Sequence, residues 1–198
     1  KQFFFLFLII MKLLTALLAS IIIFGAASAT IISVPGDYAD IQSAIDAASE
    51  NDTVLVADGV YTGENNRGLD FGGTNMVLIS ENGPDSCIID CEMSDRGMQF
   101  SNNETSASKV IGISFRNGIA FGGAGIDIML ASPVFERCII SDCTSPIGGG
   151  GVQINGGDPQ FINCVIHNNF AAEGGAVSVN FGSVSLNSCV IAANSASG

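Results

Sequence analysis

Short apolar runs alternate with polar residues in this chain and recur every 25 or 26 residues through its C-terminal half. The clearest column of equivalent positions consists of bulky apolar residues, namely Ile89, Phe115, Ile140, Ile166 and Ile191. Self-similarity at a fixed period of this length is typical of stacked supersecondary units, each of which buries its inner face against its neighbours.

The repeated runs predict strands rather than helices. Segments such as 152–154 and 164–167 are short, alternate with period two and are rich in β-branched residues. Gly and Asn residues at 117–118, 148–151 and 155–156 supply positions that tolerate positive φ in tight turns. Two or three such strands per 25 residues describe one turn of an all-β solenoid, a parallel β-helix. Equivalent residues of successive turns then stack about 4.8 Å apart.

One segment near the N-terminus has helical periodicity. Within residues 38–49, one face carries the apolar residues Ile41, Ala44, Ile45 and Ala48. Asp37 follows a Pro-Gly turn and is the candidate N-cap. We expect this helix to cover the open end of the solenoid core, as terminal repeats must. Residues 53–61 are expected to form the first strand and turn, and the β-helix to extend over 54–194.

The first 29 residues are typical of upstream residues followed by a secretory signal peptide. Met11 and Lys12 open a basic region, residues 13–24 are apolar, and Ala27-Ser28-Ala29 matches a cleavage motif. Cleavage after Ala29 predicts a secreted or cell-surface (extracellular) domain of residues 30–198. A membrane anchor over 3–24 is the alternative. The chain stops where the next glycine pair would fall, so we expect the domain to be truncated at its C-terminus.

The charge balance excludes some partners. Nineteen Asp and Glu against seven Lys and Arg give a net charge of −12, which argues against nucleic acid, whose phosphates require basic residues. Most excess carboxylates are interpreted as solvating groups. Weak calcium binding by Asp90, Glu92 and Asp95 is the alternative interpretation, and no other cofactor is expected.

Cysteine occupies a second column two residues before the first. Cys138, Cys164 and Cys189 are adjacent members of this column, and Cys87 precedes them by two turns. Stacked Cα atoms lie within disulfide range, but three neighbours cannot all pair with one another. We favour a packed thiol ladder, since buried cysteine behaves as a small hydrophobic residue, and the disulfide state stays open. The spacing does not match a zinc site.

Several motifs resemble a known family when they are taken in order. They read Val-Pro-Gly-Asp-Tyr from 34, Ile-Gln-Ser-Ala-Ile-Asp from 41, Asp-Thr-Val-Leu-Val-Ala-Asp-Gly-Val-Tyr from 52 and Gly-Ile-Ser-Phe-Arg-Asn-Gly from 112. This order resembles secreted bacterial β-helix proteins of the pectate-lyase-like superfamily, over residues 31–198. The resemblance implies a right-handed single-stranded parallel β-helix with an N-terminal capping helix. Gly-Gly-Ala-Val at 174–177 is also similar to the repeats of chlamydial polymorphic outer-membrane proteins.

One outward row of polar residues is the candidate ligand site. Alternation in the strands after the glycines turns four residues outward, namely Gln99, Asp127, Gln153 and Ser178. We expect this row to hold one carboxylate with no basic residue beside it. Such a surface suits hydrogen bonding to a polysaccharide or cell-surface glycan better than acid/base chemistry.

The enzymes of the superfamily that the chain resembles suggest a catalytic site as the alternative to a binding surface. Its lyases imply a calcium site of clustered carboxylates with an Arg or Lys base, and Asp90, Glu92 and Asp95 beside Arg96 are the closest match in composition. Its glycoside hydrolases imply carboxylates that converge on one bond. No catalytic residue is assigned on this chain from either pattern.

Two functions therefore remain. The expected one is a secreted or surface-displayed noncatalytic β-helix, an adhesin-like or glycan-interacting scaffold. The alternative is the N-terminal portion of a polysaccharide-active enzyme, a lyase or glycoside hydrolase, with catalytic turns beyond Gly198. Fold alone does not separate them. Membrane contact is expected only through the signal peptide or a missing C-terminal anchor.

Amide and carboxyl side chains also recur at one turn position. Asn117, Asp142 and Asn168 are equivalent in the repeat, and we expect their side chains to stack and stabilise the turn.

Overall fold

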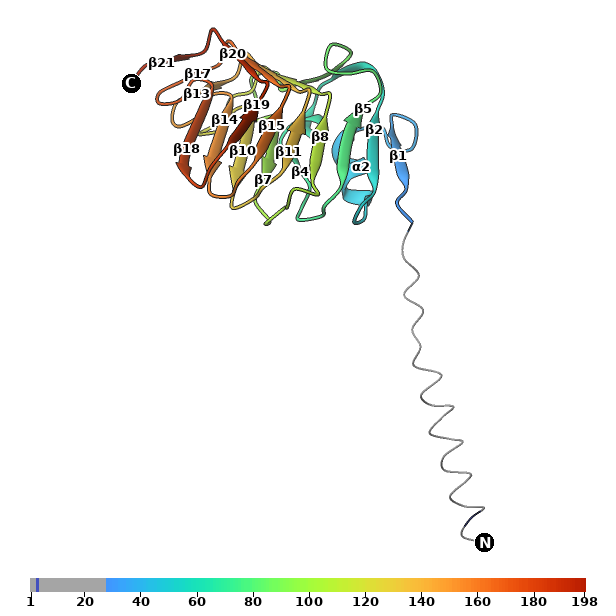
Figure 1. Ribbon diagram of the computed structural model, residues 1–198. Coiled ribbons are helices and arrows are strands. Elements are labelled where there is room, and N and C mark those ends of the chain that lie inside the picture. The colour runs from blue at the N-terminus through green and yellow to red at the C-terminus, as the bar shows by residue number, and fades with distance from the viewer. Residues whose placement is uncertain (1–2, 4–27) are drawn as a thin grey trace.

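The computed structural model describes residues 28–198 and, before them, Phe3 alone. The signal peptide predicted for residues 1–29, and the alternative anchor over 3–24, lie almost entirely outside the described residues. Within the described part, no helix combines the length and the apolar character needed to cross a membrane. The described chain is a right-handed parallel β-helix (Figure 1).

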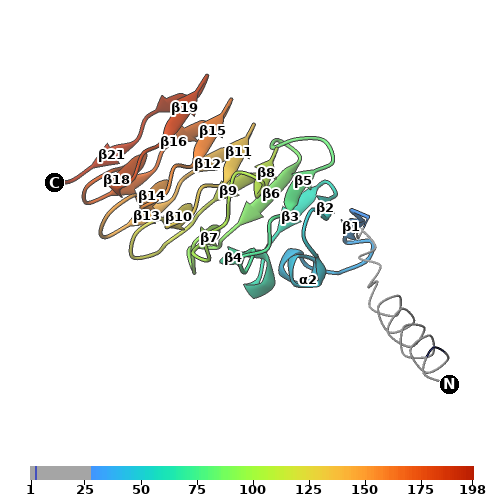
Figure 2. The same cartoon turned by 60° about the horizontal axis from the view of Figure 1, so that its bottom comes forward.

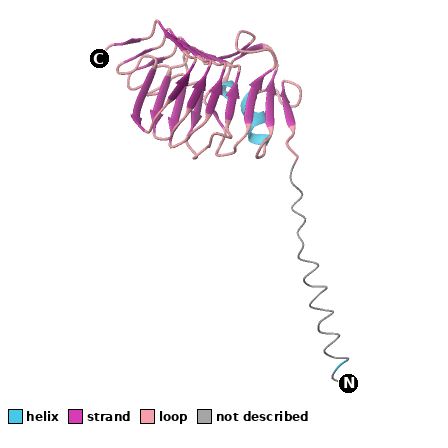
Figure 3. Ribbon diagram, in the orientation of Figure 1, coloured by secondary structure: helices cyan, strands magenta, loops and turns pink. Residues whose placement is uncertain are grey.

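Parallel strands from successive turns line up side by side in four sheets (Figures 1 and 3). Sheet A contains, in spatial order, β1 (Ile31–Val34), β2 (Thr53–Val56), β5 (Val77–Ser80), β8 (Lys109–Ile111), β11 (Val134–Glu136), β15 (Gln160–Ile162) and β19 (Ser185–Asn187). Sheet B contains β3 (Gly59–Tyr61), β6 (Cys87–Asp90), β9 (Ser114–Arg116), β12 (Ile139–Ser141), β16 (Val165–His167) and β20 (Val190–Ala192).

The other two sheets have fewer strands, five in sheet C and three in sheet D. Sheet C contains β4 (Leu69–Asp70), β7 (Met98–Phe100), β10 (Ile126–Met129), β14 (Val152–Asn155) and β18 (Val177–Phe181). The short sheet D contains β13 (Thr144–Ser145), β17 (Phe170–Ala171) and β21 (Ser195–Ala196). A 3₁₀ helix, η1 (Glu64–Asn66), lies between β3 and β4.

The predicted apolar column is confirmed in register and is buried from Ile89 to Ile166, whereas Ile191 in the last turn is exposed. Ile140 is in register with Phe115 on one side and with Ile166 on the other, and all three are fully buried. A second column is aromatic, with ring centroids 5.1 Å apart for Phe71 and Phe100, and 4.8 Å apart for the stacked rings of Phe135 and Phe161. These columns form the continuous core that no single turn could bury alone.

Two columns of left-handed residues make the corners on either side of sheet B. Between sheets A and B, the chain turns at Gly112, Arg137, Asn163 and Ser188, with φ between 51° and 66°. After sheet B it turns at Asn117, Asp142, Asn168 and Ala193, with φ between 53° and 56°. One left-handed residue per corner lets both flanking strands stay extended and inward residues stay inward.

The side-chain ladder at the second corner lies one residue later than predicted. Asn169 donates from Nδ2 to the carbonyl of Ile140 at 3.0 Å, and Asn194 donates to the carbonyl of Ile166 at 2.8 Å. Asn169 is buried, whereas Asn168 occupies the left-handed position beside it. The expectation of a stack through Asn168 and its equivalents was therefore wrong, because those residues supply the turn. The amides come from the next position in the last two turns, at Asn169 and Asn194.

The N-terminal helix is confirmed but its start was misplaced. Helix α2 spans Ile41–Ala47 and its N-cap is Asp40, whose side chain accepts the Ser43 N–H at 2.9 Å. Asp37, the predicted cap, instead accepts the N–H of Ser33 at 2.8 Å. The strand order also begins earlier than predicted, since β1 lies before the helix and pairs with β2.

Helix α2 closes the N-terminal end of the core beside β4 (Figure 2). Its apolar face is buried at Ile41, Ala44 and Ile45. The side-chain amide of Gln42 pairs with the backbone of Asp70 as a neighbouring strand would. Its Nε2 atom donates to the carbonyl of Asp70 and its Oε1 atom accepts the N–H of the same residue, both at 3.0 Å. The backbone N–H and carbonyl of Asp70 at the edge of sheet C are thereby hydrogen-bonded, which protects this edge from non-native strand pairing.

All six cysteines are free thiols, which agrees with the predicted thiol ladder. Cys138, Cys164 and Cys189 each direct Sγ toward the carbonyl two residues earlier, at 3.5 Å. Burial raises the pKa of Cys87 and of Cys143 to about 12, so both stay protonated at neutral pH. These side chains act as packing groups in a narrow core.

The register predicts different outcomes for the same substitution inside and outside the coil. Ile140→Asp places an unpaired charge between Phe115 and Ile166, and we expect the cooperative thermal transition to be lost. Val60→Asp, at an exposed position in β3, is the matched control and should lower the free energy of unfolding by no more than about 1 kcal/mol. Comparable melting curves for the two variants would show that the assignment of inner and outer faces is reversed.

Candidate functional site

The predicted polar row lies on the outer face of sheet C. Asp127 on β10 is in register with Gln99 on β7 and with Gln153 on β14, and Gln153 is in register with Ser178 on β18. Their inward neighbours on β7, β10 and β14 are buried. On β18, the last strand in the order of sheet C, Val177 is half-buried and Val179 is exposed. The row is thus continuous, and its ligand-binding role stays a prediction.

Beside this row lies a hollow of about 340 Å³, which we call the polar hollow. It spans three turns, and the side chains that matter to its chemistry are Asp127, Asn155, Glu173, Asn180, Phe121 and Met129. Asn180 donates from Nδ2 to Oδ1 of Asn155 at 2.8 Å. The sequence pattern drew attention only to Asp127 and Gln153 in this set. Asn155 and Asn180 each follow the apolar-polar-apolar run of their strand in the sequence, although a register shift after Ile154 pairs Asn155 with Phe181.

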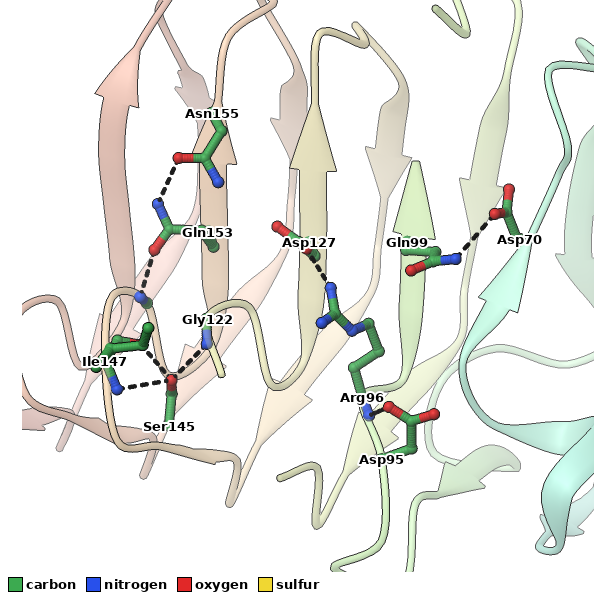
Figure 4. A network of polar contacts seen from close by, with 11 residues as sticks. Asp70, Asp95, Arg96, Gln99, Gly122, Asp127, Ser145, Ile147, Gln153 and Asn155 are labelled. Atoms are coloured by element: carbon green, nitrogen blue, oxygen red, sulfur yellow. Dashed lines mark hydrogen bonds and ion pairs between the residues drawn. The ribbon is translucent and has the colours of Figure 1, made fainter. Parts of the chain in front are cut away.

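Gln153 supports the site rather than facing a ligand. Its side chain points outward from β14 but is only 3% exposed. Oε1 accepts the N–H of Gly149 at 2.7 Å and Nε2 donates to Oδ1 of Asn155 at 3.4 Å (Figure 4). A Cβ on Gly148 would stand 2.2 Å from Oε1, so the loop lies directly on this amide. Gln153 therefore holds the loop that forms one wall of the polar hollow.

Asp127 is paired with Arg96, contrary to the expectation that no basic residue lies beside it. The Nη1 atom of Arg96 donates to Oδ2 of Asp127 (Figure 4). The side chains are 18% and 19% exposed, so the pair is largely shielded from water. Oδ1 of Asp127 is buried and accepts no hydrogen bond from the described residues. Arg96 precedes β7 and reaches across to the next turn, a path that strand alternation alone does not reveal.

Gln99 and Ser178 complete the row on either side. Gln99 donates from Nε2 to Oδ2 of Asp70 at 2.9 Å (Figure 4), and both Gln99 and Ser178 are partly exposed. The Oε1 atom of Gln99 is an acceptor that this bond leaves open, and the Ser178 hydroxyl can donate and accept. These two residues extend the polar surface along the coil axis, one turn beyond Asp127 and one turn beyond Gln153.

The three calcium candidates do not converge. Asp90 accepts from Arg116 at 2.9 Å and from Asn117 at 3.0 Å. Glu92 accepts from Arg67 at 2.5 Å. Oδ1 of Asp95 accepts the backbone N–H of Arg96 at 2.7 Å. Within residues 28–198, no three His, Cys, Asp or Glu side chains are grouped as a metal site would require.

The environment of Asp90 favours its charged form. Burial raises the pKa of this carboxyl, but hydrogen bonds from Asn117, from the N–H of Glu92 and from Arg116 outweigh burial. The net pKa lies below its ordinary value of 3.8. Asp90 therefore ties two turns together as a carboxylate, which is a structural task.

Comparisons with known proteins identify the family of the chain by one match. A family model described as a right-handed β-helix region matches residues 52–198. A crystal structure of a pectin methylesterase mutant in complex with a hexasaccharide is similar in fold, with a TM-score of 0.48 and 16% sequence identity. That similarity covers 86% of this chain and 67% of the other. No curated protein matches the chain significantly.

The shielded ion pair predicts strong coupling between its partners. Arg96→Gln and Asp127→Asn each leave one charge without its partner, whereas the double variant leaves none. In chemical denaturation we expect a coupling free energy of about 1–3 kcal/mol. The more exposed pair Arg67 and Glu92, whose carboxylate side chain is 46% exposed, is the control and should give less than about 1 kcal/mol. Equal coupling in the two pairs would contradict this assignment.

The lowered pKa of Asp90 predicts acid sensitivity with a defined sign. A carboxyl whose folded pKa lies below its unfolded value stabilises the fold above the unfolded value, and this stabilisation is lost as pH falls through the folded pKa. Asp90→Asn should therefore be less stable at pH 7 and lose less stability below about pH 3.8. Denaturation at a series of pH values measures this, with the exposed Asp85→Asn as control. An unchanged acid profile in Asp90→Asn would refute the role given to this carboxylate.

Proposed function

This chain belongs to the right-handed β-helix family, and we propose that it is a noncatalytic member that binds neutral glycans on the outer face of sheet C. We extend the proposal to a secreted or surface-displayed, adhesin-like scaffold, which the leader-like residues before Thr30 favour. The observation that carries the proposal is the polar hollow, where amide side chains from successive turns border an exposed aromatic ring.

The groups in the polar hollow match the surface of a sugar. Side-chain amides both donate and accept hydrogen bonds, as sugar hydroxyls do. Asn155 and Asn180 present amides from neighbouring strands, and Phe121, which is 79% exposed, presents a ring beside them. Apolar ring surface combined with a few placed polar groups is typical of a small-ligand site. The row through Gln99 and Ser178 continues the polar surface along the coil axis.

The same hollow is poorly suited to acid/base chemistry. A glycoside hydrolase needs one carboxyl to protonate the leaving oxygen and a second to act as base or nucleophile. Asp127 is paired with Arg96, whose Nη1 atom occupies one of the two carboxylate oxygens. The same pair engages the guanidinium that a lyase mechanism would need as a base. Glu173 is the other carboxylate that lines the polar hollow, so a hydrolase mechanism there would need Glu173 together with the paired Asp127.

Charge favours a neutral ligand over an acidic one. Beyond residue 29, five Lys and Arg against nineteen Asp and Glu give a net charge of −14. A polyanionic chain such as a uronic-acid polymer is repelled by this field, whereas a neutral glycan is indifferent to it.

Binding measurements with matched asparagine variants test the proposal. The probes are neutral xylo-, cello-, manno- and galacto-oligosaccharides, with oligogalacturonate as the acidic comparison, measured by calorimetry. We expect one neutral series to bind and Asn180→Ala to weaken that binding about five- to tenfold, the effect of one lost hydrogen bond. Asn187→Ala, an exposed asparagine on sheet A, is the control and should bind as the unmodified protein does.

Two outcomes would overturn the proposal. Absence of binding to every neutral series would remove the glycan-binding function. Release of reducing or unsaturated ends from any of the oligosaccharides, abolished by Asp127→Asn or Glu173→Gln, would establish a polysaccharide-active enzyme instead.

A further inference from the structure

A second hollow, of about 670 Å³, lies beside the polar hollow and differs from it in chemistry. We call it the apolar hollow. It is bordered by residues 94–96, 119–121 and 144–146 and by Phe170, which come from four successive turns. Of the residues singled out from the sequence, Asp95 and Arg96 line this hollow. The volume lies within the range of about 300–1,000 Å³ that is typical of small-ligand sites.

The apolar surface of this hollow is a stacked column. Ile119 pairs with Thr144 through an isolated bridge, and Thr144 is in register with Phe170. Because successive turns stack, these three residues stand in line along the outside of the coil. Phe170 is 43% exposed, and the aromatic pairs of the described chain all lie in the core column. The ring of Phe170 therefore has no aromatic neighbour in the described chain and is available to a ligand.

The apolar and polar hollows meet along a single ridge. Phe121 borders both, Pro146 borders the apolar hollow and Ile147 borders the polar one. The ion pair also joins them, because Arg96 lines the apolar hollow and Asp127 lines the polar one. A ligand that occupies the polar hollow thus has the apolar hollow within reach of a substituent.

Hydrogen bonds hold this ridge in place. Oγ of Ser145, a buried side chain, accepts the N–H of Gly122 at 2.8 Å and the N–H of Ile147 at 3.3 Å (Figure 4). These bonds tie the loop that carries Phe121 to the loop that carries Pro146. The two hollows are therefore pre-formed, which reduces the ordering cost of binding.

We propose that the apolar hollow binds an aromatic substituent, such as an aryl or aromatic acyl group, carried by the neutral glycan in the polar hollow. This inference rests on the proposed function and names the class of glycan. A sugar ring packed on Ile119 and Phe170 would turn hydroxyls toward apolar side chains, which is unfavourable. An aromatic group has no such hydroxyls, and its ring can pack against exposed phenylalanine rings.

The charges around the ridge favour an uncharged substituent. The positive charge of Arg96 is balanced by Asp127, which weakens its attraction for an anion. Asp95 also lines the apolar hollow, and the chain as a whole is acidic. A carboxylate-bearing aromatic group would be repelled, whereas a neutral ester or ether of the glycan would not.

Paired probes separate this inference from the proposed function. Each neutral oligosaccharide is titrated as the free sugar and as its 4-nitrophenyl glycoside. We expect the aryl glycoside of the bound series to bind about tenfold more tightly than the free sugar. Phe170→Ala should abolish this gain and leave the affinity for the free sugar within twofold. Phe181→Ala removes an exposed ring that lines neither hollow and should preserve the gain.

A fluorescent reporter gives a second, independent measurement. The chain contains no tryptophan, so Phe170→Trp introduces a single indole into the apolar hollow. The nitrophenyl group should quench this indole on binding, and the free sugar should leave its emission unchanged. Quenching at Phe181→Trp instead of Phe170→Trp would place the aryl group elsewhere.

The outcomes separate the two claims. Equal affinity for free sugar and aryl glycoside, or a gain that survives Phe170→Ala, overturns the inference while the binding of free sugar still supports the proposed function. Binding of aryl glycosides alone, lost in Phe170→Ala, supports the apolar hollow and contradicts recognition of the plain glycan. Absence of binding by every probe overturns both.

Discussion

The in-register stacking of each turn on the next is the constraint on which the rest of this structure depends. Every strand of sheets A, B and C pairs only with its equivalents in neighbouring turns, and all pairs are parallel. A slip of one residue would exchange the inner and outer faces of a strand, so the buried column through Ile140 and the outer row through Asp127 are fixed together. The polar row is a consequence of the core. Because Ile126 and Ile128 point inward on β10, Asp127 between them must point outward.

Stacking also explains a column of glycines that turn geometry does not. A Cβ on Gly97, Gly125 or Gly151 would lie 2.5–2.7 Å from a backbone carbonyl oxygen of the following turn. None of the three has positive φ; glycine is needed because the backbones of adjacent turns approach closely. The glycine-rich segments thus serve two purposes, with Gly122 and Gly148 in left-handed turns and Gly125 and Gly151 at close contacts. Between them they shape the loops that carry Phe121 and Ile147.

The sequence predicted the features that recur in every turn. It did not predict the contacts that depend on the path of a loop. Period and alternation predicted the parallel β-helix, the inward column and the row of Gln99, Asp127, Gln153 and Ser178. They missed the pairing of Arg96 with Asp127 and the burial of Gln153, because both depend on loops that cross the outer face. The N-cap shows the same limit on a smaller scale. Asp37 and Asp40 both precede an apolar helical face, and only the backbone conformation selects Asp40, which is extended and within reach of Ser43.

A solenoid whose stability is a sum over neighbouring turns can vary its outer surface without altering its core. In this chain that freedom is used at one corner, where loops from successive turns rise beside sheet C. The ion pair of Arg96 and Asp127 lies between two hollows of different chemistry, one amide-rich and one apolar. A carboxylate in this position would be a candidate acid or base if it stood alone. Arg96 instead holds one oxygen of this carboxylate in a shielded ion pair. A side chain fixed in this way beside a pre-formed hollow suits recognition better than proton transfer. The same fold without Arg96 would present a different chemistry on an identical core. The function therefore depends on the ion pair and not on the β-helix fold.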